Sequence, residues 1–278
     1  MIETVLVVIP ANNEQALIRA CLEAVSAART HARKALGDRV DVRTVVVLDS
    51  CVDATEREIT AAHHVQTVHT GFARVGSARA AGVGHARRGL TTIPGNVWIA
   101  STDADSRVPL DWIVTMVGLA DEGADVVLGT VRPDIAPTSS TYRRWRRRYV
   151  GSDGHPHVHG ANLGLRADLY DRINGWPMVA SDEDVDLVRR AEGCDDVRFS
   201  RTGAIPVVTS ARLVGRAPYG FAGYLRRLPP ERRHDDDLLR TVRHVELPRP
   251  ELTRPELTRV EPARFDPLLR DPAGPSNG

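Results

Sequence analysis

The chain has 278 residues, of which 42% are hydrophobic and 26% charged, the usual composition of a soluble globular protein with a sizeable core. Its formal net charge of +1 gives no general attraction to nucleic acid. No apolar run approaches the ~20 residues that span a bilayer, so the sequence predicts no transmembrane segment and leaves open only peripheral membrane contact.

Apolar runs and helical patterns alternate along residues 1–130. Strands are predicted at residues 4–10, 42–48, 65–69, 97–100 and 125–131. Helices are predicted at residues 14–36, 53–62 and 77–88, and another follows with Pro109 in its first turn. Continuous apolar strands that alternate with helices are typical of a parallel sheet with both faces covered.

The pattern loosens after residue 131. A basic aromatic segment, a His-rich loop, a helix near residues 166–173 and an acidic helix start at residue 181 follow in order. Residues 229–278 are rich in Pro, Arg and Asp and contain the repeat RPELTRPELTR, which predicts a largely irregular tail. The sequence therefore predicts one α/β domain over residues 1–228, followed by this tail.

Polar side chains follow three of the predicted strands where each strand ends. In parallel α/β sheets, ligands bind beyond the carboxyl ends of the strands. Asp103 and Asp105 follow the strand at residues 97–100, and two carboxylates at this spacing can together meet a divalent cation. The alternative is a turn in which Asp105 or Ser106 caps the next helix.

The first two strands end in a similar way. Asp49 stands at the tip of the second strand, where a carboxylate can accept hydrogen bonds from a nucleobase or a ribose, and Asp53 stands at the start of the next helix. Asn13 and Glu14 follow the first strand. For Asp53 and Asn13 the alternative role is that of a helix N-cap.

Six segments occur in the order found in a known enzyme family. They are VVIPANNE, VVVLDSCVDAT, GSARAAGVGHA, WIASTDADSRVP, GANLGLRADLYDRINGW and SDEDVDLVRRA. Together they resemble the family 2 glycosyltransferases of GT-A fold. The resemblance implies a Rossmann-like, mostly parallel central sheet flanked by helices, with a nucleotide-sugar-binding half at residues 1–130 and an acceptor-binding half at residues 131–228.

The resemblance also implies roles for individual residues. It predicts Mg²⁺ or Mn²⁺ bound by Asp103 and Asp105. Separately, the alternate histidines of the His-rich loop make His159 a further candidate ligand. The donor, a UDP- or GDP-sugar, is expected to contact Pro10, Ala11, Asn13, Glu14, Asp49, Asp53, Arg79, Asp103 and Ala104. The residues expected on the acceptor side are Gly160, Ala161 and Asn162, where small side chains let the backbone approach a sugar.

The catalytic base is predicted within SDEDVDL, residues 181–187. A carboxylate here would take the proton of the acceptor hydroxyl, and Asp184 is the first candidate and Glu183 the second. The alternative is structural. Ser181 followed by Asp184 makes a capping box, and acidic residues suit a helix N-terminus.

Two basic segments complete the candidate residues. Arg212 and Arg216 are expected to hold the donor diphosphate, since arginine binds phosphate oxygens bidentately; the alternative is that both are ordinary surface arginines. The segment YRRWRRRY, residues 142–149, would meet an anionic acceptor or a lipid headgroup, or form a solvated helix face. The near-neutral net charge argues against nucleic acid.

The activity predicted is metal-dependent transfer of a sugar from a nucleoside diphosphate to a hydroxyl acceptor, and an acidic base favours inversion. Three alternatives stay open: a retaining transferase acting on a small phosphorylated acid, a sugar nucleotidyltransferase, and an inactive nucleotide-sugar-binding scaffold. A homodimer is also left open. Three widely spaced cysteines and an N-terminus without a basic flank predict a cytoplasmic location.

Overall fold

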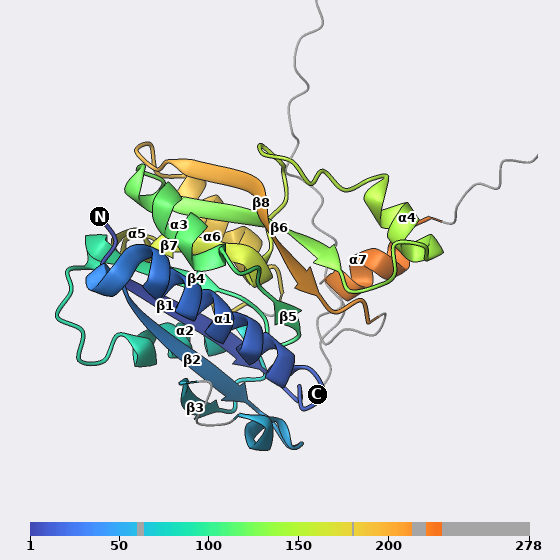
Figure 1. The fold of residues 1–278 in the computed structure, drawn as a ribbon, viewed down its shortest axis with the longest axis horizontal. Helices are drawn as coiled ribbons and strands as arrows, with labels where there is room; N and C mark the ends of the chain where they lie inside the picture. Colours follow the sequence, from blue (N-terminus) through green and yellow to red (C-terminus); the bar gives the residue numbers. More distant parts are fainter. Residues whose placement is uncertain (60–63, 180, 213–220, 230–278) are drawn as a thin grey trace, which may run out of the picture. The chain divides into compact units, whose positions relative to one another are not determined.

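A mixed eight-stranded sheet lies at the centre of the computed structural model, which describes residues 1–229 apart from 60–63, 180 and 213–220 (Figure 1). The strand order is β3-β2-β1-β4-β7-β6-β8-β5. The strands are β1 (Thr4–Ala11), β2 (Asp41–Asp49), β3 (Gln66–Thr70), β4 (Val97–Ser101), β5 (Ser106–Arg107), β6 (Val126–Pro133), β7 (Leu163–Arg166) and β8 (Phe199–Thr209).

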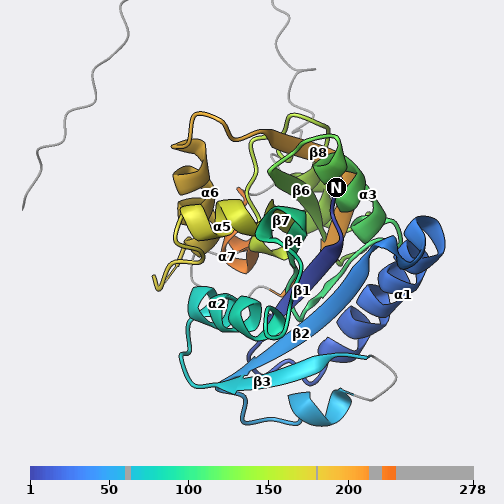
Figure 2. The same ribbon diagram turned by 90° about the vertical axis from the view of Figure 1, so that its left-hand side faces the viewer.

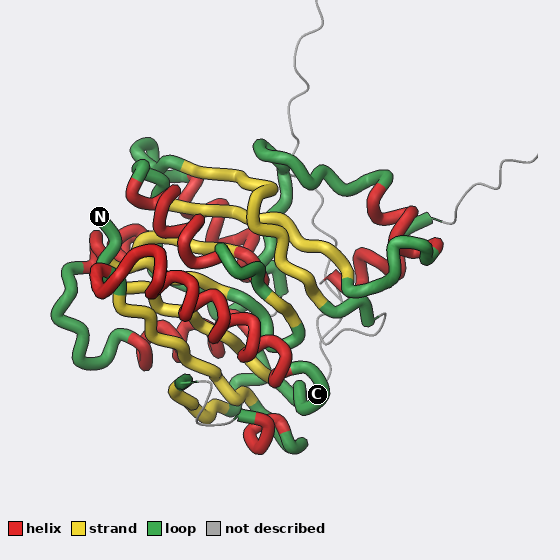
Figure 3. The backbone as a smooth tube through the Cα atoms, in the orientation of Figure 1, coloured by secondary structure: helices red, strands yellow, loops and turns green. Residues whose placement is uncertain are grey.

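Helices cover both faces of this sheet, and Figure 3 shows the strands running between them. They are α1 (Ile18–Leu36), α2 (Val75–Ala86), α3 (Trp112–Asp121), α4 (Ser140–Arg146), α5 (Ala167–Arg172), α6 (Glu183–Glu192) and α7 (Phe221–Arg227). Helices α1 and α3 pack on one face, whereas α2, α5 and α6 pack on the other (Figure 2). Alternate residues of β1 contact opposite layers, with Val7 in the first core and Val8 in the second.

The predicted α/β architecture is confirmed, and its parallel part brings three strand ends together. Strands β1 to β4 pair in parallel, with Ala11 opposite Leu48 and Val8 opposite Ser101. The carboxyl ends of β1, β2 and β4 therefore share one edge. Beyond β4 the sheet is mixed, because β7 runs antiparallel between β4 and β6, and β5 runs antiparallel to β8.

Two predicted helices differ from the observed ones. The first begins at Ile18 instead of Glu14, because the amides of Leu17 and Ile18 both donate to the Glu14 carbonyl and close a turn there. The helix predicted at residues 53–62 is a short 3₁₀ turn, Thr55–Glu58, in the part of that range that the structure describes. Only Thr55 of this turn is buried, so it has no apolar stripe to support a longer helix.

The described residues belong to one compact unit, Met1–Arg232. The tail predicted from residue 229 lies outside the described residues from residue 230 onward. The three thiols, Cys21, Cys51 and Cys194, are free. Among the helices of the described residues, none combines the length and apolarity needed to cross a bilayer.

Candidate active site

A pocket of about 520 Å³ opens where β1, β2 and β4 end. Its size suits a small-molecule ligand. Most of the predicted site residues line it, from both halves of the chain: Pro10, Ala11, Glu14, Asp49, Arg79, Asp103, Ala104, Asp105, His159, Gly160, Ala161, Glu183, Asp184 and Arg212. The structure thus gathers into one pocket residues that are up to 202 positions apart in the sequence.

Carboxylates outnumber basic side chains in this pocket. The seven acidic residues among its described lining are Glu14, Asp49, Asp103, Asp105, Asp182, Glu183 and Asp184, and the three arginines are Arg74, Arg79 and Arg212. Such an excess of negative charge repels an anion and attracts a cation. A diphosphate therefore needs a positive partner to enter this pocket.

Asp105 is the most strongly perturbed of these carboxylates. Burial, with the charge of Asp103 next in importance, raises its pKa to about 6, although Arg212 acts in the opposite direction. The Arg212 Nη2 atom lies 2.7 Å from Asp105 Oδ2 and 2.8 Å from Glu14 Oε1. One guanidinium thus compensates two carboxylates, which leaves Asp105 only partly neutralised.

Strand pairing fixes the backbone at Asp105. Its carbonyl accepts a hydrogen bond from the Ser210 amide, 3.1 Å away. The next residue, Ser106, pairs with Thr209 of β8, and their hydroxyl oxygens lie 2.9 Å apart. The turn that carries Asp103 and Asp105 is therefore held against the end of β8, and its carboxylates face the pocket.

Arg79 of α2 joins two walls of the pocket. Its side chain is 2% exposed, with Nη2 2.6 Å from Asp103 Oδ1 and Nη1 2.5 Å from Glu183 Oε1. The guanidinium also lies over the Trp176 ring, 4.9 Å from its centroid. Burial acts to lower the pKa of Arg79, but the two carboxylates raise it above its ordinary value. This arginine, predicted to contact the donor, is committed to protein carboxylates here.

Asp49 at the tip of β2 organises the loop that follows β3. Its Oδ1 accepts from the Phe72 amide at 2.7 Å and from the Thr70 hydroxyl at 3.0 Å, and its Oδ2 accepts from the Arg74 amide at 3.1 Å. Within the same loop Ala73 has a left-handed φ of 49°, a strained conformation for a residue with a Cβ. The loop that Asp49 holds forms this side of the pocket.

Asp184 lies at the start of α6, but the capping box does not form. The N-cap is Asp182, with φ of 59° and no side-chain capping bond, and the Ser181 hydroxyl donates to the Asp182 carboxylate. Asp184 instead accepts from the Gly160 amide at 2.7 Å and from the Val185 amide at 2.9 Å. Burial raises its pKa above the ordinary value, which is the direction that a general base working near neutral pH requires.

Aromatic side chains form a wall that the sequence analysis did not identify. Tyr149, Phe221 and Tyr224 line the pocket beside His157 and His159. The Tyr149 hydroxyl lies 2.9 Å from His159 Nε2, and its ring stacks on His157 with centroids 4.0 Å apart. Burial lowers the pKa of His159 to about 3. The signal for Tyr149 was its spacing from two other aromatic residues in YRRWRRRY.

His159 does not join the two aspartates in a preformed metal cluster. Among the described residues, no group of three His, Cys, Asp or Glu side chains is arranged to hold a metal ion. The Nε2 atom of His159 is engaged by Tyr149 instead. Asp103, Asp105 and His159 all line the pocket, and their roles as metal ligands stay predictions.

Asn162, predicted on the acceptor side, is a core residue that lies outside the pocket lining. It is completely buried. Its Oδ1 accepts from Trp112 Nε1 at 2.9 Å, and its Nδ2 donates to the carbonyls of Thr130 and Ile205. Three hydrogen bonds to α3, β6 and β8 occupy the amide fully, so it ties the second half of the sheet to α3.

Asn13 and Asp53 also lie outside the pocket lining, and neither caps a helix as the alternatives proposed. With φ of 54°, Asn13 turns its Oδ1 to accept from the amides of Val52 and Asp53. Asp53 accepts from the Thr55 amide at 2.9 Å. The two residues brace the loops after β1 and β2. Arg216 lies outside the described residues.

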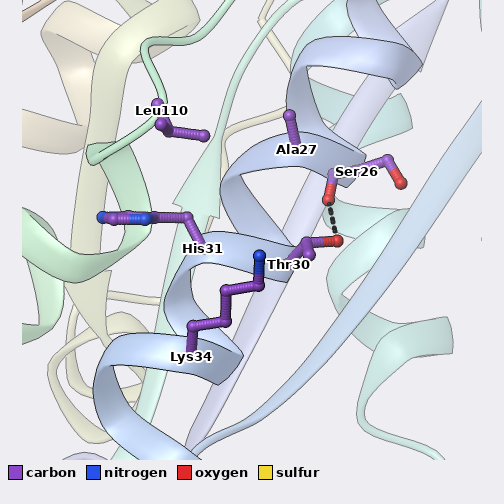
Figure 4. A pocket seen from close by; sticks show the side chains of 6 residues that line it. All are labelled: Ser26, Ala27, Thr30, His31, Lys34 and Leu110. Atoms are coloured by element: carbon purple, nitrogen blue, oxygen red, sulfur yellow. Dashed lines mark hydrogen bonds between the residues drawn. The ribbon is translucent and has the colours of Figure 1, made fainter.

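A second, shallower hollow of about 340 Å³ lies on the outer face of α1 (Figure 4). It is lined by Ser26, Ala27, Thr30, His31, Lys34 and Leu110. The hydroxyl of Thr30 already donates to the Ser26 carbonyl within the helix. None of the predicted site residues lies here.

The chain is similar in fold to solved glycosyltransferase structures. TarS of S. aureus, residues 1–349 in complex with UDP, aligns with a TM-score of 0.54 and 13% identity over 75% of this chain and 61% of that one. The full TarS structure gives a TM-score of 0.55 and 13% identity, over 74% and 36%. The chain thus spans about six tenths or less of the length of these TarS structures, and their common fold is GT-A.

Glucosyl-3-phosphoglycerate synthase of M. tuberculosis aligns less well, with a TM-score of 0.46 and 19% identity over 81% of this chain and 77% of that one. No curated protein sequence matches the chain. The sequence profile of glycosyl transferase family 2 matches residues 6–173, which is more than half of the chain. The chain belongs to glycosyl transferase family 2.

Proposed function

We propose that this chain is a metal-dependent glycosyltransferase that moves a sugar from a nucleoside diphosphate to a hydroxyl acceptor. One observation carries the proposal: the strand-end carboxylates and the acidic start of α6 line a single pocket. The donor would lie along the ends of β1, β2 and β4, which is where α/β sheets bind ligands. TarS, which shares the fold, has been crystallised with UDP, and this agrees with a UDP-sugar donor.

The residues present fit a divalent cation. Asp103 and Asp105 offer the carboxylate oxygens that Mg²⁺ and Mn²⁺ prefer. Burial first, and the charge of Asp103 second, raise the pKa of Asp105 to about 6, so its ionised form would gain from a cation beside it. When bound, the cation would neutralise the leaving diphosphate. Arg212, whose side chain is 31% exposed at the pocket edge, would contact the same phosphates by exchanging its present partners, Glu14 and Asp105, for phosphate oxygens.

Asp184 is the proposed base. It would take the proton of the acceptor hydroxyl while that oxygen attacks the anomeric carbon and the nucleoside diphosphate leaves. The Gly160 amide fixes one of its oxygens at 2.7 Å, so the carboxylate is already oriented toward the acceptor side. Attack from the face opposite the leaving group would invert the anomeric configuration.

Donor binding tests the proposal directly. UDP- and GDP-sugars are titrated into the protein with and without Mn²⁺, and the melting temperature is followed, since a ligand that binds only the folded state raises it. We expect a shift that requires both sugar nucleotide and metal. Asp105→Asn should abolish it, whereas Asp134→Asn, which alters an exposed ion pair with Arg107, should keep it. Metal-independent binding in both variants would contradict the metal assignment.

Turnover tests the base. Asp184→Asn keeps an acceptor oxygen for the Gly160 amide but removes the proton acceptor, so we expect donor binding to persist and turnover to fall by about 10²–10⁴. The anomeric configuration of the product, read by NMR, reports inversion. A variant that turns over normally would refute this role for Asp184.

A further inference from the structure

Helix α4 and the turn after it are amphipathic. Tyr142, Trp145 and Tyr149 recur at helical spacing and pack in a row, with ring centroids 5.2 and 4.9 Å apart. Trp145 and Tyr149 are 4% and 6% exposed. The arginines between them are exposed, apart from the half-buried Arg144. The segment therefore turns its rings to the core and its charges to the outside.

Helix α7 repeats this arrangement. Leu225 and Leu228 are buried and belong to the same core cluster as Trp145, while Arg226 and Arg227 are exposed. Figure 1 shows α4 and α7 at the same end of the molecule. Four exposed arginines, here called the arginine surface, are Arg146 at the end of α4, Arg147 and Arg148 in the turn after it, and Arg226 of α7.

The two stretches of sequence that carry these arginines are free of acidic residues. Residues 135–152 and 203–230 contain no Asp or Glu, although the whole chain has a net charge of only +1. These two stretches are therefore locally basic, although the protein as a whole is nearly neutral. Clusters of exposed arginines attract the headgroups of anionic lipids electrostatically.

The arginine surface is continuous with the candidate active site. Tyr149, at the end of the first basic segment, and Phe221, Ala222 and Tyr224 of α7 all line the pocket. The Tyr149–His159 hydrogen bond and the His159–Phe221 ring contact join the two segments at the pocket wall. Arg148 directly precedes Tyr149, and Arg226 stands two residues after Tyr224, so a surface bound by these arginines would lie near the pocket wall that follows β6 and β8.

We propose that the arginine surface docks the protein on an anionic lipid bilayer. A bilayer needs only exposed positive charge, which this surface offers. Single-stranded nucleic acid needs stacking rings as well, and the rings of this segment face inward. Docking would set the pocket beside the headgroups, so the acceptor hydroxyl is inferred to belong to a membrane lipid. This last step rests on the proposed glycosyl transfer, whereas docking does not.

Vesicle binding by the full chain tests docking without any activity. Sedimentation with phosphatidylcholine vesicles is compared with and without phosphatidylglycerol, at low and high salt. We expect binding only to anionic vesicles, lost at high salt. The variant Arg146→Gln/Arg147→Gln/Arg148→Gln should bind about a hundredfold more weakly. The control Arg33→Gln/Arg57→Gln/Arg88→Gln removes equal charge from exposed sites on other elements and should bind like the wild type.

Three results would overturn the inference: equal losses in both triple variants, equal binding to neutral vesicles, or no vesicle binding at all. Retention of single-stranded RNA by the wild type but not by the Arg146–Arg148 variant, without vesicle binding, would assign the surface to nucleic acid instead. The metal-dependent donor shift is measured on the same samples. A donor shift without docking refutes only the inference, and docking without a donor shift refutes only the proposed function.

Discussion

At the scale of single residues, His159 shows how burial suppresses an ordinary titration. Its pKa is lowered from the ordinary value of 6.5 to about 3. Between these two pH values the unfolded chain binds a proton at this residue and the folded protein does not. The folded state therefore loses stability as the pH falls through this window. We expect His159→Gln, which cannot titrate, to lose less free energy of unfolding than the wild type between about pH 7 and about pH 4. Urea denaturation measures both losses, and equal losses would contradict a neutral buried imidazole.

Arg79 is the residue whose removal should matter most for stability. Replacing it by Met leaves Asp103 and Glu183 facing each other without the guanidinium that now lies within 2.6 Å of both. Breaking a buried ion pair from one side costs about 3–5 kcal/mol, and we expect a loss of this size in urea denaturation. Adding Asp103→Asn and Glu183→Gln to Arg79→Met should restore much of it. A single variant as stable as the wild type would show that the network is not stabilising.

The sequence predicted the location of a site residue well when its position at the end of a strand was enough to place it in the pocket. Asp103, Asp105 and Glu14 follow strands whose ends are fixed by sheet pairing, so their place in the pocket followed from strand order. Asn13 was different, because its left-handed φ of 54° turns the side chain to the neighbouring loop. Asn162 follows a polar, His-rich loop in the sequence, which suggested an exposed position. It is buried because of tertiary packing around Trp112, which the sequence does not reveal.

At the scale of elements, α2 sits so close to the sheet that one glycine is required. A Cβ at Gly82 would lie 2.5 Å from Val8 Cγ1 and 2.8 Å from Val47 Cγ2, whereas a Cβ at Gly84 of the same helix meets nothing within 4 Å. Gly84→Ala should therefore raise stability by about 0.5–1 kcal/mol through helix propensity. Gly82→Ala gains the same propensity but overpacks the core, and we expect a net loss of about 1–2 kcal/mol. Thermal unfolding of both variants tests these opposite changes in stability. A rise in stability for both variants would contradict the prediction.

Elements with a long, unbroken pattern were predicted well, and the others were missed for physical reasons. β1 and β4 are buried along nearly their whole lengths, and β2 is buried from Thr44 to Asp49, so all three contain continuous apolar runs. β8 was missed because Gly203 and Pro206 interrupt its alternation, residues that seldom occur inside strands. β7 has only four residues, too few for a periodic signal, and its antiparallel placement depends on both of its neighbours.

At the scale of the whole molecule, the two core clusters run from Ile2 to Leu228. A chain that ends after Arg232 keeps every one of these residues, so we expect its melting temperature and donor shift to match those of the full chain. A chain that ends after Ser210 loses Leu225 of α7, the following Leu228, and Arg212, and it should melt earlier and bind donor poorly. Equal melting of the three chains would show that α7 adds nothing to the core.

The pairing of β5 with β8 has a consequence for how this architecture can diversify. Ser106, next to the proposed cation ligand Asp105, is anchored by a partner 103 positions later, Thr209. Recombination near residue 130 would take the turn with Asp103 and Asp105 from one parent and β8 from the other. These two segments would not have evolved together. The cation affinity of such a chimera should therefore depend on both parents. Chimeras that keep their activity should have their crossover point after Ser210.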